Sequence, residues 1–207
     1  SNTGNSGMWT CVVDNGFGAS NAYGTISKAV FNGQLYLGVV NTDDEAGFIS
    51  KTINGIDWEK VGEGEFHSGG VHVVSALSVF NNSLYAYVFG ENGSQIWSSM
   101  DGSTWQLEFT IPDLTVGDRG ALEVLNGNLY LIVGNSEDGL EVWYTKNGSD
   151  WNALIKNGIN GVENVTLEFD SSATIFNNAL YFGDINYSNG AIIWNLQQLL
   201  YLPLMIR

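Results

Sequence analysis

The sequence predicts an all-β fold built from four copies of one repeat. Its 207 residues include 26 glycines and two prolines, with 13% aromatic and only 14% charged residues. Charged residues make up roughly 25% of typical globular domains, so this composition excludes disorder and favours β-structure. One apolar segment also recurs about every 48 residues, a period typical of propeller blades. We therefore expect a β-propeller of four blades, each with four antiparallel strands.

Each repeat opens with a segment typical of a tight β-hairpin. Two apolar runs flank an Asn-Gly or Asn-Asn pair, and these residues tolerate the positive φ angles that a two-residue turn requires. The pattern predicts strands one and two of each blade. It covers Val30–Tyr36, Val79–Tyr85, Val124–Tyr130 and Ile175–Tyr181.

A second hairpin follows in three of the repeats. Its turn is Asn54-Gly55, Asp101-Gly102 or Asn147-Gly148. All seven tryptophans fall into two repeat positions around this hairpin, and we interpret their rings as filling the space between adjacent sheets. Trp97, Trp143 and Trp194 lie on the expected third strand, whereas Trp9, Trp58, Trp105 and Trp151 open the fourth.

The ends of the chain suggest how the propeller closes. The fourth unit lacks the second hairpin turn, while residues 8–13 begin with a fourth-strand tryptophan one repeat before Trp58. We expect this N-terminal strand to complete the fourth blade and cover its edge. Half of a larger dimeric propeller and a fragment remain alternatives. The whole of 1–207 is expected to be one domain, with units at about 19–65, 73–113, 119–160 and 171–194, and an atypical tail at 195–207.

The turn at Ser99–Trp105 resembles a degenerate Asp-box, the Ser-x-Asp-x-Gly-x-Thr-Trp turn of propeller blades. Asp101 and Gly102 are adjacent here, and Asn54 and Asn147 replace the aspartate in the sister turns. The repeat as a whole is similar to kelch-like and Asp-box-like β-propeller repeat proteins of extracellular type. This resemblance implies the fold and an extracellular or periplasmic location, and it brings no active site with it.

Charge excludes several functions. A net charge of -15 with only seven lysines and arginines removes the electrostatic attraction on which nucleic-acid binding depends. No apolar run approaches the roughly 20 residues of a membrane-spanning helix, so we expect no membrane insertion. Sialidases bind the substrate carboxylate with several arginines. This chain has only Arg119 and Arg207, so we do not expect sialidase chemistry.

Most acidic residues fall in loops that would share one face of the propeller. These are the loops between strands two and three and the connections between blades. Carboxylates suit calcium, so calcium is possible at Asp43, Asp44, Glu137 and Asp138, and no cofactor is expected to be required. The alternative is that the acidic loops only keep the protein soluble. The candidate ligand-binding residues are Asp43, Asp44, Glu45, Glu91, Glu137, Asp138 and Tyr187.

Repetition favours binding over catalysis, because several equivalent weak sites gain by avidity. We therefore expect a non-enzymatic binding module, lectin-like or protein-interacting, that recognises carbohydrate or protein as a monomer or homodimer. The alternative is a glycan-processing hydrolase or lyase with carboxylate catalysis. An enzyme would carry residues that break the repeat. Lys28 and Glu123 are the clearest polar examples on the first strands, and we interpret both as structural.

Overall fold

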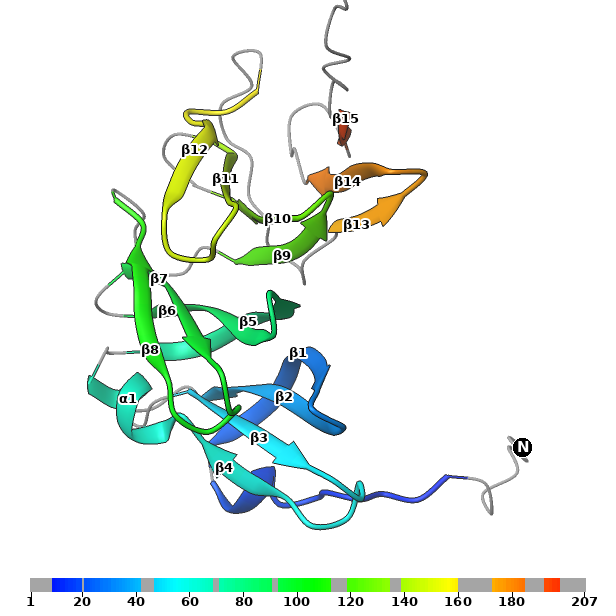
Figure 1. Ribbon diagram of the computed structural model, residues 1–207. Coiled ribbons are helices and arrows are strands. Elements are labelled where there is room, and N and C mark those ends of the chain that lie inside the picture. The colour runs from blue at the N-terminus through cyan, green and yellow to red at the C-terminus, as the bar shows by residue number, and fades with distance from the viewer. Residues whose placement is uncertain are drawn as a thin grey trace, which may run out of the picture. The chain divides into compact units, whose positions relative to one another are not determined.

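The computed structural model describes residues 9–19, 21–41, 47–68, 71–90, 93–112, 119–134, 139–159, 173–184 and 192–197. The chain divides into two compact units, Ser1–Gly117 and Asp118–Arg207. Antiparallel strands dominate both (Figure 1), which confirms the all-β prediction. The expectation of a single domain stays a prediction.

Unit 1 contains the first two repeats, each a four-stranded antiparallel meander. Strand β1 lies beside β5, and the backbone pair Val40–Val73 joins the two meanders. A short 3-10 turn at Gly16–Gly18 precedes the first meander, and the helix α1 (Glu63–Ser68), which the sequence did not predict, follows it. The strands are β1 (Ala22–Phe31), β2 (Gln34–Asn41), β3 (Phe48–Thr52), β4 (Glu59–Val61), β5 (Val71–Phe80), β6 (Ser83–Gly90), β7 (Gly93–Ser99) and β8 (Gln106–Thr110).

Unit 2 contains the third and fourth repeats. The third is again a four-stranded meander, whereas the fourth has three strands in the order β13-β14-β15. Strand β9 contacts β13, so the first strands are neighbours here as they are in unit 1. The strands are β9 (Gly120–Leu125), β10 (Asn128–Val133), β11 (Glu141–Thr145), β12 (Trp151–Ile155), β13 (Ala173–Phe176), β14 (Ala179–Asp184) and β15 (Ile192–Gln197).

The first hairpin of every repeat has the predicted turn. Asn32 and Asn126 have φ angles of 49° and 50°, and the glycine after each is also positive. In the Asn81-Asn82 turn both asparagines are positive, at 48° and 61°. Two consecutive residues in this region match the right-handed twist of the flanking strands. These φ angles confirm the tight two-residue turns that the sequence predicted.

The N-terminal segment differs from the prediction. Residues 9–13 form no strand, Trp9 is 89% exposed, and Met8 lies outside the described residues. The ring contacts of this segment come from Phe17, whose centroid lies 6.5 Å from that of Phe48 and 5.3 Å from that of Trp58. Strand β15 also runs to Gln197, past the expected end at Trp194, and residues 198–207 of the tail lie outside the described structure. Closure of the propeller by residues 8–13 stays a prediction.

The core of unit 1 lies between its two meanders. Phe31, Tyr36, Ile49, Val61 and Phe66 from the first repeat pack against buried residues of the second. The Phe66 ring lies 5.6 Å from each of two second-repeat tryptophans, which confirms their expected role between sheets. The second repeat contributes Val74, Leu77, Leu84, Ala86, Val88, Trp97 and Trp105.

Candidate functional site

The first strands of the repeats share one register position that stands opposite a tyrosine. In β9 this position is Glu123, which pairs with Tyr130 of β10. The other three repeats carry a small residue there, so Glu123 places one carboxyl group where its sister strands have none. The equivalent pairs are Ala29 with Tyr36, Ser78 with Tyr85 and Thr174 with Tyr181.

The environment of Glu123 changes its acidity. Its strand neighbours Ala121 and Leu125 belong to the apolar cluster between β9 and the fourth repeat, which also contains Tyr130. Because side chains alternate along a strand, Glu123 lies on that same face, and it is half-buried. Burial raises the pKa of the Glu123 carboxyl above its usual value, because removal of water disfavours the charged form. A carboxyl held in this way can keep a proton at a pH where ordinary glutamates have lost it.

Lys28 lies in unit 1, on strand β1. It pairs in register with Leu37 and is exposed. An exposed amino group on this strand can contact an anionic ligand, but no contact with another of the described residues supports a role for Lys28 in proton transfer.

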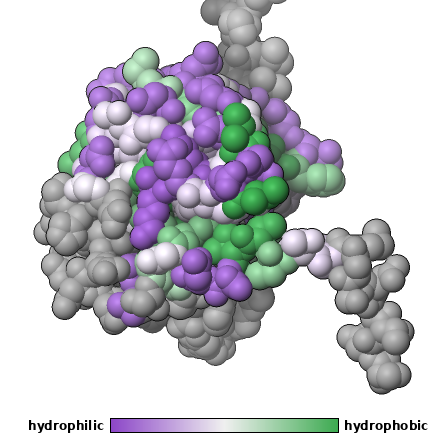
Figure 2. Space-filling model, turned by 90° about the horizontal axis from the view of Figure 1, so that it is seen from below, coloured by the Kyte–Doolittle hydropathy of each residue, from purple (hydrophilic) through white to green (hydrophobic). Residues whose placement is uncertain are grey.

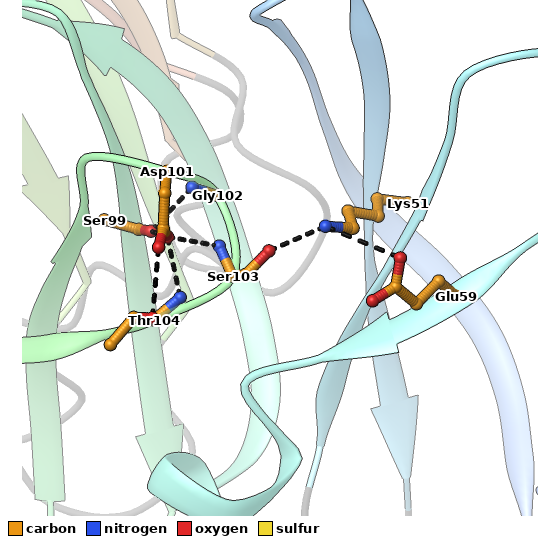
Figure 3. A network of polar contacts seen from close by, with 7 residues as sticks. All are labelled: Lys51, Glu59, Ser99, Asp101, Gly102, Ser103 and Thr104. Atoms are coloured by element: carbon orange, nitrogen blue, oxygen red, sulfur yellow. Dashed lines mark hydrogen bonds and ion pairs between the residues drawn. The ribbon is translucent and has the colours of Figure 1, made fainter.

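The turn around Asp101 is saturated by its own hydrogen bonds (Figure 3). Asp101 Oδ1 accepts from the backbone N–H groups of Ser103 and Thr104 at 2.7 and 2.8 Å, and Oδ2 accepts from the Thr104 hydroxyl at 3.1 Å. The Gly102 N–H donates to Ser99 Oγ at 2.8 Å. The backbone N–H groups of Thr104 and Ser103 hold the pKa of Asp101 well below its usual range. This carboxylate stays ionised and shapes the turn, so it is a poor candidate for proton transfer.

A buried lysine ties this turn to the first repeat. Lys51 of β3 donates from Nζ to Ser103 Oγ at 2.7 Å, and its ion pair with Glu59 of β4 spans 3.6 Å (Figure 3). The contact joins two neighbouring meanders at the second hairpin turn. Its geometry is that of a structural link, and it leaves Lys51 committed to protein partners.

Unit 1 also has a pocket of about 450 Å³ at the N-terminal segment. Figure 2 shows apolar surface gathered beside the start of the described chain on this side of the molecule. The pocket is mainly apolar, with Asp14 and Thr25 as its main polar side chains. Its residues are Val12, Val13, Asp14, Gly16, Phe17, Ala22, Gly24, Thr25, Leu37, Val39 and Trp58.

The candidate residues predicted from the sequence all lie outside the described residues, so the structure neither joins nor separates them. The calcium prediction is equally untested. In the part of the chain that is described, no group of three or more His, Cys, Asp or Glu side chains could hold a metal ion. The residues in question are Asp43, Asp44, Glu45, Glu91, Glu137, Asp138 and Tyr187.

The sequence alone pointed to Glu123 as a break in the repeat, but not to its burial. Burial depends on the packing of β9 against the fourth repeat, which no local pattern reports. The pocket beside Trp58 was also missed, because the sequence predicted an N-terminal strand that packs elsewhere. No helix among the described residues is long and apolar enough to cross a membrane.

The solved structures that resemble this chain include β-propeller glycoside hydrolases. This similarity confirms the propeller prediction and leaves the number of blades open. No protein-family model and no curated protein matches the sequence. The Penicillium chrysogenum α-L-arabinanase, solved with arabinobiose, has a TM-score of 0.60 and 12% identity over 83% of this chain and 62% of its own. The phage phi92 endosialidase has a TM-score of 0.57 and 13% identity over 84% of this chain and 35% of its own.

A third similar structure is an α-L-arabinofuranosidase from Clostridium thermocellum. Its TM-score is 0.52, with 16% identity over 85% of this chain and 68% of its own. The chain thus spans between about one third and two thirds of the length of these three proteins. At such low identity the likeness concerns the fold.

These neighbours correct the functional expectation. The similar structures named above are glycoside hydrolases, and they contradict the expectation of a non-enzymatic binding module and of a protein that is not an enzyme. The expectation was wrong because it rested on the equivalence of the repeats. A propeller with nearly equivalent blades can still carry one asymmetric site, and Glu123 is such a departure from equivalence.

Proposed function

We propose that this chain is a glycan-processing hydrolase of β-propeller fold. The observation that carries the proposal is its structural similarity to propeller glycoside hydrolases, among them the arabinanase and the arabinofuranosidase. A carbohydrate is then the substrate. Lyase chemistry on a glycan is the second possibility, because it too relies on carboxylates.

Glu123 is the residue to which we assign the role of general acid. Hydrolysis of a glycosidic bond needs a protonated carboxylic acid that gives its proton to the leaving-group oxygen. The acid must keep its proton near neutral pH, and enzymes achieve this by burial. Glu123 is half-buried with a raised pKa and lies on a first strand beside the first strand of the next repeat.

A second carboxylate is required to activate water or to attack the sugar. We assign it to the acidic loop of unit 2, whose candidates are Glu137 and Asp138; ligand binding by Asp43, Asp44, Glu45 and Glu91 in the loops of unit 1 stays a prediction. A bound calcium ion at these loops is compatible with this assignment and stays a prediction, as does a substrate contact from Tyr187.

The second-hairpin turns support a relationship to Asp-box-like repeats. Three copies share one hydrogen-bond plan: a Ser or Thr hydroxyl accepts from the glycine N–H, at 2.8 Å for Gly102 and 2.9 Å for Gly55 and Gly148. We propose that they are degenerate Asp-box turns. An extracellular or periplasmic location fits that relationship and a glycan substrate.

The test is an activity screen with a matched pair of variants. Purified protein would be assayed on chromogenic arabinofuranosides, arabinan, sucrose and a sialoside. We expect hydrolysis of at least one of them and a loss of about 100-fold or more in Glu123→Gln, the range for removal of a general acid. Glu59→Gln is the control, because Glu59 is an exposed glutamate on the outer strand β4.

The outcomes separate the alternatives. Activity that persists in Glu123→Gln would remove this residue from the mechanism but leave the hydrolase proposal standing. An unsaturated product, which absorbs ultraviolet light, would replace hydrolase by lyase. No turnover of any glycan in the screen, by protein with a native circular dichroism spectrum, would contradict the proposed function.

A further inference from the structure

The third repeat differs from its sister repeats along one row of the sheet. In every repeat a tyrosine on the second strand pairs in register with one residue of the first strand and one residue of the third. In the third repeat this row consists of Glu123, Tyr130 and Tyr144. Among the four rows, only this one has a glutamate on the first strand and an aromatic ring on the third. The sister rows are Ala29, Tyr36 and Lys51; Ser78, Tyr85 and Ser98; and Thr174, Tyr181 and Asn195.

The ring of the row's tyrosine also has a different neighbour in the third repeat. In the sister repeats it lies against a phenylalanine of the first strand, with ring centroids 6.0 to 6.2 Å apart and planes tilted by 58° to 62°. Leu125 stands in the place of that phenylalanine in the third repeat. The Tyr130 ring stacks on Tyr144 instead, at 6.1 Å and with 29° between the planes. The aromatic support of the tyrosine has thus moved from the first strand to the third.

This arrangement places an aromatic wall beside Glu123. Side chains directly opposite each other on antiparallel strands have Cβ atoms about 4.5–5.5 Å apart, so the Glu123 side chain lies beside the Tyr130 ring, which is itself buried. Ala29 holds the equivalent position in the first repeat and packs against the core between the first two meanders. Strand β9 likewise lies beside β13, the first strand of the fourth repeat (Figure 1). Glu123 therefore faces the fourth repeat, with the stacked rings on one side of it.

The other charged groups of unit 2 lie at strand ends, in the part of the chain that is described. The side chains of the fourth repeat in the apolar cluster on this face carry no charge, and the third repeat adds the two tyrosines of the row. Burial is accordingly the cause of the raised pKa of Glu123. Side chains that keep water from this carboxyl therefore decide its protonation. The charged residues at strand ends or directly beyond them are Arg119, Glu141, Lys146, Asp150, Lys156 and Asp184.

We propose that Tyr130 and Tyr144 are positioning residues for the general acid Glu123. This inference rests on the proposed function and names the side chains that prepare its acid. The Tyr144 ring holds the Tyr130 ring in place by stacking, and the Tyr130 ring excludes water from one side of the carboxyl. Burial against an aromatic ring is one way in which enzymes keep a carboxylic acid protonated near neutral pH. Neither tyrosine needs to touch the substrate for this role.

The test replaces the third-strand ring by residues that the sister rows carry. Ser98 and Asn195 occupy the position of Tyr144 in the second and fourth repeats, so Tyr144→Ser and Tyr144→Asn rebuild rows that the fold accepts. We expect the pKa of Glu123 to fall toward the ordinary glutamate value in both variants, because the Tyr130 ring loses its stacking partner and water reaches the carboxyl. Tyr144→Phe keeps the stack and should keep the wild-type pKa.

The pKa of Glu123 is measured by NMR titration of the carboxyl carbon in protein labelled with ¹³C, and Glu123→Gln identifies the signal. Tyr181→Ala is the matched control. Tyr181 is the tyrosine of the fourth row and is half-buried, and it lies on the opposite face of its strand from Leu180 and Phe182, which pack toward the third repeat. The control removes an equivalent ring from unit 2 and should leave the pKa of Glu123 unchanged.

Kinetics on a glycan that the protein hydrolyses give a second measurement. The basic limb of the pH profile of kcat/KM reports the general acid of the free enzyme. This limb should move to lower pH in Tyr144→Ser, with kcat/KM about threefold or more below wild type at neutral pH and equal to it where Glu123 is protonated in both proteins. Tyr144→Phe should restore the wild-type profile. A merely structural role of the ring would lower kcat/KM by the same factor at every pH.

An unchanged pKa of Glu123 in Tyr144→Ser and Tyr144→Asn would overturn the inference. An equal fall in Tyr144→Phe would also overturn it, because the hydroxyl group and not the stack would then be responsible. An equal fall in Tyr181→Ala would do the same by showing a general loosening of unit 2. The NMR titration needs no substrate, so a pKa that falls as expected in a protein that hydrolyses no glycan would contradict the proposed function alone.

Discussion

Glu123 stands out among single residues because its half-buried position disfavours the charged form of its carboxyl group. The sister positions carry Ala29 and Ser78, which are also half-buried, and Thr174, which is exposed; none of these residues carries a charge that burial could disfavour. A charge-capable residue at such a place lowers stability at neutral pH. Proteins retain such residues at sites where activity requires them, and this agrees with the acid role proposed for Glu123.

The stability of the Glu123→Gln variant should depend on pH in a defined direction. Burial raises the folded-state pKa of Glu123, so the stability that its neutral form contributes is complete below roughly pH 4, the ordinary glutamate range, and is lost as the pH rises through the folded pKa. Glutamine has no charge to lose. We expect the free energies of unfolding of variant and wild type to be close at low pH, and the variant to be the more stable at pH 8.

Urea denaturation at several pH values measures this difference. Glu59→Gln is the control, because Glu59 is exposed and pairs with Lys51 only at 3.6 Å. Parallel stability curves for Glu123→Gln and wild type across the pH range would contradict the assigned burial of the carboxyl.

At the scale of elements, the second-hairpin turns keep one hydrogen-bond pattern with two different pairs of side chains. Asp101 accepts a hydrogen bond from Thr104, whereas in the sister turns the roles are reversed: Asn54 Nδ2 donates to Asp57 at 2.8 Å. Asn147 does the same with Asp150 at 2.7 Å. In each turn the Oδ1 atom of the first side chain also accepts from the backbone N–H groups two and three residues later. The carboxylate and its partner have exchanged positions without loss of the turn.

This exchange makes a double substitution testable. Thr104→Asp alone would place a second carboxylate beside Asp101 and should destabilise the protein. Asp101→Asn in the same chain rebuilds the Asn54–Asp57 arrangement and should restore most of the loss. We expect a coupling free energy of about 0.5–3 kcal/mol in a double-mutant cycle measured by urea denaturation. Additive effects would contradict the shared plan of the turns.

The third strands show where sequence reasoning about elements ends. The repeated tryptophan was visible, and Trp97 and Trp143 donate from Nε1 to Gln95 and Glu141 at 2.9 and 2.8 Å. Trp194 has Ile192 at the equivalent place, and its buried Nε1 has no hydrogen-bond partner among the described residues. Periodicity located the ring, but only the structure shows which indole is satisfied.

Across the whole molecule, the repeat predicted the strands and their order well, because turn residues and apolar periodicity are local. It did not predict α1 or the register shifts shared by β1 and β5, which depend on the packing between meanders. The sequence predicted a fourth strand at residues 8–13 from the position of Trp9, but residues 9–13 form no strand. Function was predicted least well, since equivalence between repeats says little about the one position that departs from it.

The net charge of -15 gives a prediction for the entire chain. Seven basic residues cannot neutralise 22 acidic ones, so self-repulsion opposes the compact state and salt should screen it. We expect the Tm to rise between about 0.02 and 0.5 M sodium chloride, where the Debye length falls severalfold. Sucrose at matched osmolality controls for general solvent effects. A Tm that falls with salt would show that attractive ion pairs dominate.

The asparagine residues in the turns of the first hairpins are also sites of slow deamidation. At Asn32-Gly33 and Asn126-Gly127 the asparagine is exposed, and the glycine that follows offers no side chain to hinder attack by its own nitrogen on the amide carbon. Such attack expels ammonia and forms a cyclic imide, which water then opens to aspartate or isoaspartate, so asparagine is among the residues least stable to heating. Each event would add a negative charge and, as isoaspartate, lengthen the backbone within a two-residue turn. We therefore expect this protein to deamidate first at the hairpins whose turns are Asn-Gly.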